Sequence, residues 1–227
     1  MLTTTTSPYG LVHADFVDYQ GHLLERETAK ALGQMALAAS RDGIKIEVCS
    51  GYRDFSRQLK IWNDKAQGKR TVLDQDSQPV ELKHKSDKEI LELIMLWSAL
   101  PGTSRHHWGT DIDVYDANSI QLNQLQLVSS EYLSSGPCGN LHQWLIKHAG
   151  DFGFYFPFQE GLSGVSAEPW HLSYYPVSSD ILRVFDVDAL KQVLNEADLE
   201  LKTEVMARID SLVEEYVYTI APPPNQL

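Results

Sequence analysis

The sequence has no apolar run close to the ~18 residues that a membrane-crossing helix needs, so we expect no membrane partner. Its first residues, MLTTTTSPYGLVHADF, contain neither the basic region nor the apolar region of a secretory signal. The sequence as given therefore predicts a cytoplasmic location, or a periplasmic one if an export signal was removed.

Cations and cysteines are also scarce. The chain has 19 Lys and Arg against 31 Asp and Glu, a formal net charge of −12. Nucleic-acid binding needs clustered cations, so we expect no nucleic-acid partner. Of the two cysteines, Cys49 closes an alternating apolar run and is interpreted as a small buried residue. Two residues alone leave a disulfide between Cys49 and Cys138 undecided.

What is present suits one globular domain, because 43% of the 227 residues are hydrophobic and no Pro- or Gly-rich linker divides the chain. Hydrophobic periodicity predicts strands over 44–50, 111–116 and 168–176. It predicts helices over 23–42, 54–67, 89–100, 141–149, 187–197 and 200–216. The polar residues 68–85 predict a surface hairpin or loop, and Ser86 with Glu89 predicts a capping box.

These elements give an α+β layout. We expect a main domain over residues 1–179 and a C-terminal helical extension over 180–220 that packs on it. Residues 221–227, APPPNQL, are predicted to be an extended or disordered tail.

The stretch PGTSRHHWGTDIDVYD (101–116) contains candidate metal-binding residues. His106 lies on the loop before Gly109, and Asp113 lies seven residues later on the predicted strand. Imidazole nitrogen and carboxylate oxygen are good zinc ligands, and a loop and a strand can converge on one ion. The residues alone leave open which of His106 and His107 binds.

A third ligand is offered by His171 in the segment Glu168-Pro169-Trp170-His171. Pro169 argues against the helical arrangement of the H-E-x-x-H motif. A turn would instead bring Glu168 and His171 to the same ion. Glu168 could then act as general base and later as general acid. No G-x-S-x-G elbow is present, which disfavours a serine hydrolase.

The motifs S-R-H-H-W-G-T-D-I-D and E-P-W-H, preceded by Ser50-Gly51-Tyr52-Arg53 and Gln58, resemble those of the LAS-type zinc peptidases. The nearest group is the VanY-like D-alanyl-D-alanine carboxypeptidases, and the resemblance spans roughly residues 44–176. It implies a small, mainly antiparallel sheet flanked by helices, as in hedgehog-like folds, and one Zn²⁺ per chain.

The resemblance also implies roles for individual residues. His106 rather than His107 would bind zinc, together with Asp113 and His171. Glu168 would be the acid/base, and Arg53 would face the developing oxyanion. Substrate would contact a further set: Tyr52, Gln58 and Ser104.

The chain departs from the family at two positions. Asp111 stands where the family usually has a small residue, and we expect it near the metal or hydrogen-bonded to a ligand histidine. Ser173 stands where an arginine is common, which puts substrate recognition in question.

The expected function is removal of terminal D-alanine from a peptidoglycan-derived peptide by a monomer, as a D,D- or an L,D-carboxypeptidase. A peptidoglycan endopeptidase and a non-catalytic zinc-containing module that binds a peptide or protein partner are the alternatives. The presence of Glu168 and Arg53 favours an enzyme over the binding module.

Overall fold

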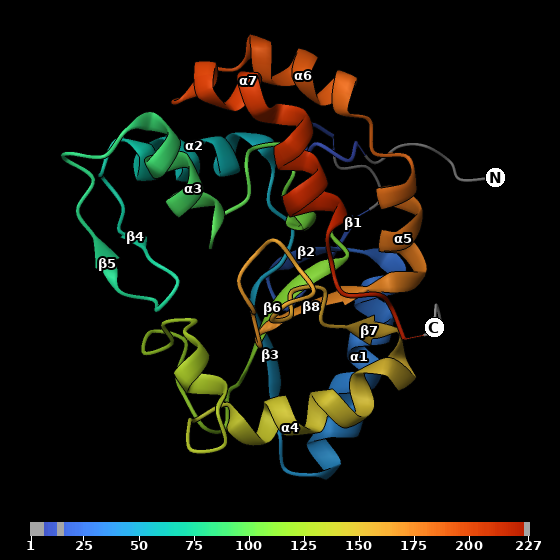
Figure 1. The fold of residues 1–227 in the computed structure, drawn as a ribbon. Coiled ribbons are helices and arrows are strands. Elements are labelled where there is room, and N and C mark those ends of the chain that lie inside the picture. The colour runs from blue at the N-terminus through green and yellow to red at the C-terminus, as the bar shows by residue number, and fades with distance from the viewer. Residues whose placement is uncertain (1–6, 13–15, 225–227) are drawn as a thin grey trace.

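A computed structural model describes residues 7–12 and 16–224 (Figure 1). Its central sheet has four antiparallel strands in the order β3 (Ile46–Ser50), β6 (Asp111–Asp116), β8 (His171–Tyr174) and β7 (Phe154–Tyr155). Two small hairpins accompany it: β1 (Phe16–Tyr19) with β2 (His22–Glu25), and β4 (Val72–Leu73) with β5 (Pro79–Val80). The predicted α+β class with a small antiparallel sheet is confirmed.

Helices lie on two sides of this sheet (Figure 1). On one side are α1 (Arg26–Arg41) and α4 (Gly139–His148). On the other are α2 (Phe55–Ala66), α3 (Asp87–Met95), α6 (Val187–Glu196) and α7 (Lys202–Val213). The remaining helical elements are α5 (Tyr175–Arg183), the 3₁₀ turns η1 (Arg105–Trp108), η2 (Ser129–Tyr132) and η3 (Ala149–Phe152), and the π-helical turn η4 (Glu214–Tyr218).

The buried apolar residues form two clusters. In the first, Leu32 and Met35 of α1 pack with Ile112 and Leu172 of the sheet. In the second, residues from α2 and α3 pack with residues from α6 and α7: Trp62, Leu91, Leu190 and Ile209. The C-terminal helices therefore share a core with α2 and α3, while the division at residue 179 stays a prediction. Helix α5 runs across that position.

Several element bounds differ from those predicted. The helix predicted over 23–42 begins at Arg26, because Leu23 and Leu24 pair with β1 and Glu25 caps the helix through its side chain. The strand predicted over 168–176 is limited to His171–Tyr174, and α5 starts at once, with a proline in its first turn. The helix predicted over 89–100 ends at Met95.

Other local predictions agree with the structure. Ser86 and Glu89 form the expected capping box, and Asp54 caps α2. Residues 68–85 contain the short β4–β5 hairpin. Both cysteines are free thiols. The tail prediction falls partly on residues 225–227, outside the described residues, and Ala221 before them is buried.

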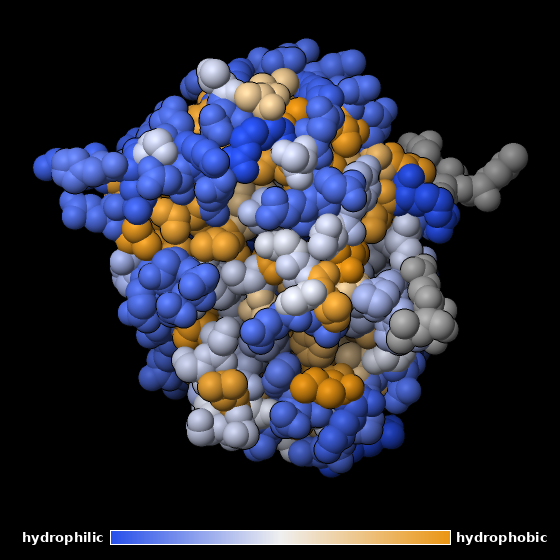
Figure 2. All heavy atoms as spheres, in the orientation of Figure 1, coloured by the Kyte–Doolittle hydropathy of each residue, from blue (hydrophilic) through white to orange (hydrophobic). Residues whose placement is uncertain are grey.

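Among the described residues, no helix has the length and apolar character needed to cross a bilayer. The face seen in Figure 2 is mostly hydrophilic, and its hydrophobic residues form separate patches.

Candidate active site

The register of β6 against β8 builds the base of the site. Asp113 pairs with His171, and Asp111 pairs with Ser173. Side chains alternate along a strand, so these four lie on one face of the sheet. Ile112 and Leu172, between them, belong to the hydrophobic cluster of α1 and α4. One strand pair therefore supplies both core residues and polar site residues.

The turn before β6 brings His106 to this face. Residues Arg105–Trp108 form a 3₁₀ turn that ends at Gly109, which has a φ of 68°. A Cβ atom at Gly109 would lie 2.9 Å from the backbone nitrogen of Glu25. Only glycine combines this backbone conformation with that close approach. The glycine between His106 and Asp113 is therefore required by the path of the chain.

His106, Asp113 and His171 meet in a buried group, with one ligand atom of each lying within 4.8 Å of the others. His106 Nε2 is 3.4 Å from Asp113 Oδ2, and His171 Nδ1 is 3.1 Å from Asp113 Oδ1. Zinc bonds of about 2.0–2.2 Å in tetrahedral geometry place ligand atoms roughly 3.3–3.5 Å apart. The donor types fit a zinc ion, and the two contacts of Asp113, one from each carboxylate oxygen, lie near this spacing.

Hydrogen bonds fix which nitrogen of each histidine faces this centre. His106 Nδ1 is 3.0 Å from the carbonyl oxygen of Gly51, which accepts its proton and leaves Nε2 toward Asp113. His171 Nε2 is 3.0 Å from Asp111 Oδ1, which leaves Nδ1 facing Asp113. Such outer partners orient metal-binding histidines. The hydrogen bond expected between Asp111 and one of the candidate metal-binding histidines is present, with the Asp111 carboxylate as acceptor.

Asp111 is held in turn by Arg105, a residue that the sequence analysis missed. Arg105 Nε donates to Asp111 Oδ1 at 2.7 Å, and its Nη2 donates to Ser173 Oγ at 2.7 Å. Thr110 Oγ1 and Ser173 Oγ donate to the other carboxylate oxygen. Burial opposes ionisation, but Arg105 and His171 hold the pKa of Asp111 below its usual range. The position of Arg105 directly before His106 in the S-R-H-H motif was the sequence feature that could have indicated its role.

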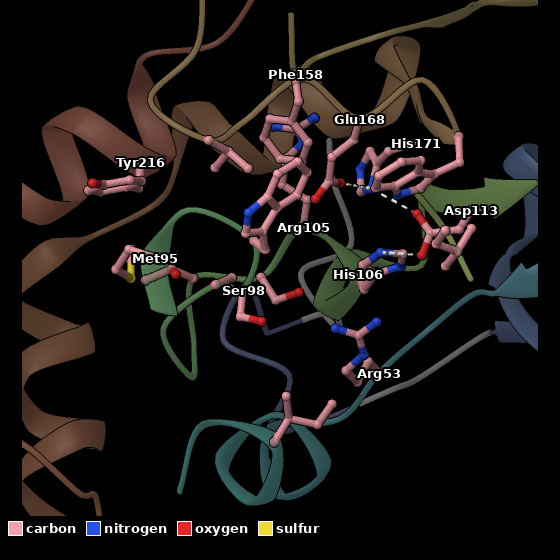
Figure 3. A pocket seen from close by; sticks show the side chains of 18 of the residues that line it. Arg53, Met95, Ser98, Arg105, His106, Asp113, Phe158, Glu168, His171 and Tyr216 are labelled. Atoms are coloured by element: carbon pink, nitrogen blue, oxygen red, sulfur yellow. Dashed lines mark hydrogen bonds and ion pairs between the residues drawn. The ribbon is translucent and has the colours of Figure 1, made fainter. Parts of the chain in front are cut away.

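Glu168 reaches the same centre from a turn. The backbone nitrogen of His171 donates to the Glu168 carbonyl at 3.1 Å. The segment therefore forms a turn, as the presence of Pro169 predicts. Glu168 Oε2 then lies 3.4 Å from His171 Nδ1, and Figure 3 shows its carboxylate pointing toward the histidines. Burial raises the pKa of Glu168 to about 7. A carboxyl group with that pKa can both accept and release a proton near neutral pH.

Arg53 enters from the turn between β3 and α2. Its Nη1 donates to Gln58 Oε1 at 2.8 Å and its Nη2 donates to Ser50 Oγ at 3.1 Å. Its backbone carbonyl accepts from His107 Nδ1, whose Nε2 accepts from the Gly102 N–H at 3.0 Å. Burial lowers the pKa of both Arg53 and His107. His107 thus supports the Arg53 turn and points away from the three candidate metal-binding residues.

A cavity of about 270 Å³ opens over these groups. Ligand clefts usually measure about 300–1,000 Å³, so this space suits a ligand of one or two residues. Ser104 lines the cavity, and its predicted contact with substrate stays a prediction. In the described part of the chain, the cavity lining does not include Tyr52 or Gln58.

The expected substrate contacts of Tyr52 and Gln58 are not supported by their positions. Both polar atoms of the Gln58 side chain are hydrogen-bonded within the protein. Its Nε2 donates to the Ala99 carbonyl at 2.6 Å, and its Oε1 accepts from Arg53. Gln58 therefore positions Arg53. Tyr52 lines a different surface pocket and packs edge-on against Phe16.

The cavity is richer in cations than the rest of this acidic chain. It is lined by two acids, Asp113 and Glu168, and by four cations: Arg53, Lys65, Arg70 and Arg105. Lys65 was missed in the sequence, although it lies two helical turns after Gln58 on the same face of α2. A cation-lined cavity in a protein of net charge −12 favours an anionic ligand.

Comparisons with known proteins identify the family of the chain. A family model described as VanY, D-alanyl-D-alanine carboxypeptidase, matches residues 21–177. This range covers well over half of the chain, so the chain belongs to the VanY family of D-alanyl-D-alanine carboxypeptidases, and the resemblance noted in its motifs is confirmed.

Individual relatives share 30% or less of their sequence with this chain over the matched residues. An uncharacterized protein of Haemophilus influenzae is 30% identical over 121 residues, which cover 52% of this chain and 92% of the relative. A D-alanyl-D-alanine carboxypeptidase of Enterococcus faecalis is 30% identical over 147 residues, 63% of this chain and 44% of that protein. The crystal structure of a vancomycin-resistance D,D-pentapeptidase VanY variant in complex with Zn(II) has a TM-score of 0.53 at 22% identity, covering 74% of this chain and 84% of its own. That likeness shows a shared fold.

Proposed function

We propose that this protein is a zinc-dependent carboxypeptidase that removes a terminal D-alanine from peptidoglycan-type peptides, as a D,D- or an L,D-enzyme. The observation that carries the proposal is the meeting of three kinds of group in one cavity. These are three residues that could hold a metal ion, a carboxyl group whose pKa is raised to about 7 by burial, and an arginine that forms no salt bridge in the described part of the chain. The family assignment supports the reaction class.

His106, Asp113 and His171 would hold one zinc ion per chain. Three protein ligands leave one coordination position open, as is usual for catalytic zinc. The ion would polarise the scissile carbonyl and lower the pKa of a bound water. Asp111 and Gly51 would keep the two imidazoles in the tautomers that this requires.

Glu168 would accept the proton of the attacking water and deliver it to the amine of the departing D-alanine. Its buried position supports this, because a carboxylate in water would release the proton too readily for the second step. Arg53 would stabilise the negative charge on the tetrahedral intermediate. Its guanidinium is held by Ser50 and Gln58, so little reorganisation would be needed in the transition state.

The experiment is mass spectrometry of the products from a panel of peptides incubated with the zinc-loaded protein. The panel has an acyl-D-Ala-D-Ala peptide, a peptide that ends in an L-centre followed by D-Ala, and both peptides as C-terminal amides. A carboxypeptidase releases D-alanine from a free acid and leaves the amides uncut. Cutting of the amides at the same rate would indicate an endopeptidase. Tight peptide binding without any product would indicate a non-catalytic module.

A further inference from the structure

Three of the cavity cations form no salt bridge with an acid of the described residues: Arg53, Lys65 and Arg70. Arg53 is held beside the metal ligands by Gln58 and Ser50. The acid nearest in sequence to the other two, Asp64, is paired with Lys60 at 2.7 Å on the exposed side of α2. Lys65 and Arg70 both line the cavity, although Asp64 also interacts electrostatically with Arg70.

Lys65 is placed inside the cavity wall. It lies in the last turn of α2, and its Nζ donates to Ser98 Oγ at 2.6 Å. Figure 3 shows Ser98 between Met95 and His106, on the wall that runs away from the metal ligands. The Lys65 side chain is therefore fixed where a ligand bound at the metal would extend. Its hydrogen bond to Ser98 uses one of the three ammonium protons.

A half-buried ammonium group without a salt-bridge partner is less stable than one in water. Burial, together with the charges of Arg70 and Arg53, lowers the pKa of Lys65 to about 8, and the charge of Glu168 opposes this shift. Burying a charge is costly unless a partner is present, so binding an anion here would be favourable. Ser98 adds a hydroxyl beside the ammonium group, and Arg70 adds a second charge at the exposed rim.

We propose that Lys65, with Ser98 and Arg70, forms a carboxylate-binding subsite of this cavity. The inference rests on the carboxypeptidase function proposed above, and the carboxylate it assigns to the subsite is the free C-terminus of the peptide. An acidic side chain elsewhere in the peptide offers the same chemistry. Arg53, with both ends of its guanidinium already held, remains for the scissile carbonyl. The two tasks of a carboxypeptidase, gripping the terminus and stabilising the oxyanion, then fall to different cations.

The test compares Lys65→Met, Lys65→Arg and Lys60→Met in the zinc-loaded protein. Methionine keeps the length of the side chain and removes the charge. Lys60 is the matched control, because it lies on the same helix and its salt bridge with Asp64 faces solvent. The readouts are KM and kcat for a free-acid acyl-D-Ala-D-Ala peptide with no acidic side chain. The same measurements are made on a second free-acid peptide that has a glutamate upstream of the D-Ala-D-Ala. Both peptides are also tested as their C-terminal amides. In a Glu168→Gln background, calorimetry gives the Kd of the same peptides.

Lys65→Met is expected to raise KM and Kd of the free-acid peptide by roughly ten- to hundred-fold, the effect of one hydrogen bond to a charged group. The value of kcat should change less, Lys65→Arg should recover most of the loss, and Lys60→Met should behave as wild type. Amides should bind weakly to wild type and be insensitive to Lys65→Met. A loss seen only with the glutamate peptide would keep the subsite and assign it to the side-chain carboxylate.

Equal losses for acids and amides, or an effect no larger than that of Lys60→Met, would overturn the subsite while D-alanine release continued. If the wild-type protein neither binds nor cuts any of the peptides, the proposed function itself fails, and the subsite fails with it. The two failures are therefore distinguishable.

Discussion

Replacing Asp111 tests the buried network behind the metal site. Asp111 and Arg105 are both buried, at 0% and 4% exposure, and form an ion pair at 2.7 Å. Removing one partner of a buried pair leaves an uncompensated charge and costs about 3–5 kcal/mol. For a domain of this size each kcal/mol shifts Tm by about 2–4 °C. Asp111→Ala should therefore lower the Tm of the metal-free protein by roughly 6–20 °C, measured by calorimetry.

The same substitution should weaken zinc binding, because His171 Nε2 loses its acceptor. Loss of an outer-shell partner typically reduces metal affinity by roughly 10–100-fold, which competition with a chromophoric chelator measures. The double variant Arg105→Met/Asp111→Leu separates the two effects. It removes both charges, so most of the stability should return while zinc affinity stays low.

A Tm change below about 2 °C in Asp111→Ala would refute the buried-pair argument. Wild-type zinc affinity in the same variant would show that Asp111 does not orient His171.

Three further predictions concern single residues. Alanine in place of His106, Asp113 or His171 should remove zinc, as measured by atomic absorption. His107→Ala should retain zinc and lose about 1–3 kcal/mol of stability, since the Gly102 N–H is left unpaired. Zinc loss from His107→Ala alone would contradict the assignment of the three ligands. Arg53→Lys keeps the charge but loses the planar guanidinium group, so steady-state kinetics should show kcat falling more than KM rises. A rise in KM with little change in kcat would indicate that Arg53 binds the substrate in its ground state instead. Burial lowers the pKa of Lys65 to about 8, so it is protonated below that pH and neutral above it. KM for a free-acid peptide should therefore rise as pH passes about 8, and the rise should be absent in Lys65→Met; the same rise in that variant would exclude Lys65 as its source.

The central geometry of the site could be predicted from the sequence because it depends on local patterns. Alternation in DIDV places Asp111 and Asp113 on one face of a strand, and the glycine before it marks the turn that carries His106. Pro169 correctly indicated that Glu168 and His171 meet through a turn. Each of these inferences uses residues that are close in sequence.

The remaining features depend on long-range packing. Arg105 contacts Ser173, and the Lys65 ammonium meets Ser98, across separations of 68 and 33 residues. No local pattern reveals such partners. The start of α1 was also mispredicted for a non-local reason, because Leu23 and Leu24 fit a helical period but pair with β1. The position of Gln58 beneath Arg53 likewise required the structure.

The most direct test of the central claim is D-alanine release by three matched samples: zinc-loaded wild type, the same protein after chelation, and zinc-loaded Glu168→Gln. Products of a free-acid acyl-D-Ala-D-Ala peptide are quantified by mass spectrometry, and zinc content is measured in parallel. We expect release by wild type, none after chelation with recovery on adding zinc, and a decrease on the order of 10²-fold or more in Glu168→Gln with zinc retained. Release that persists without metal, or near-normal release by Glu168→Gln, would contradict the proposed metal-dependent mechanism.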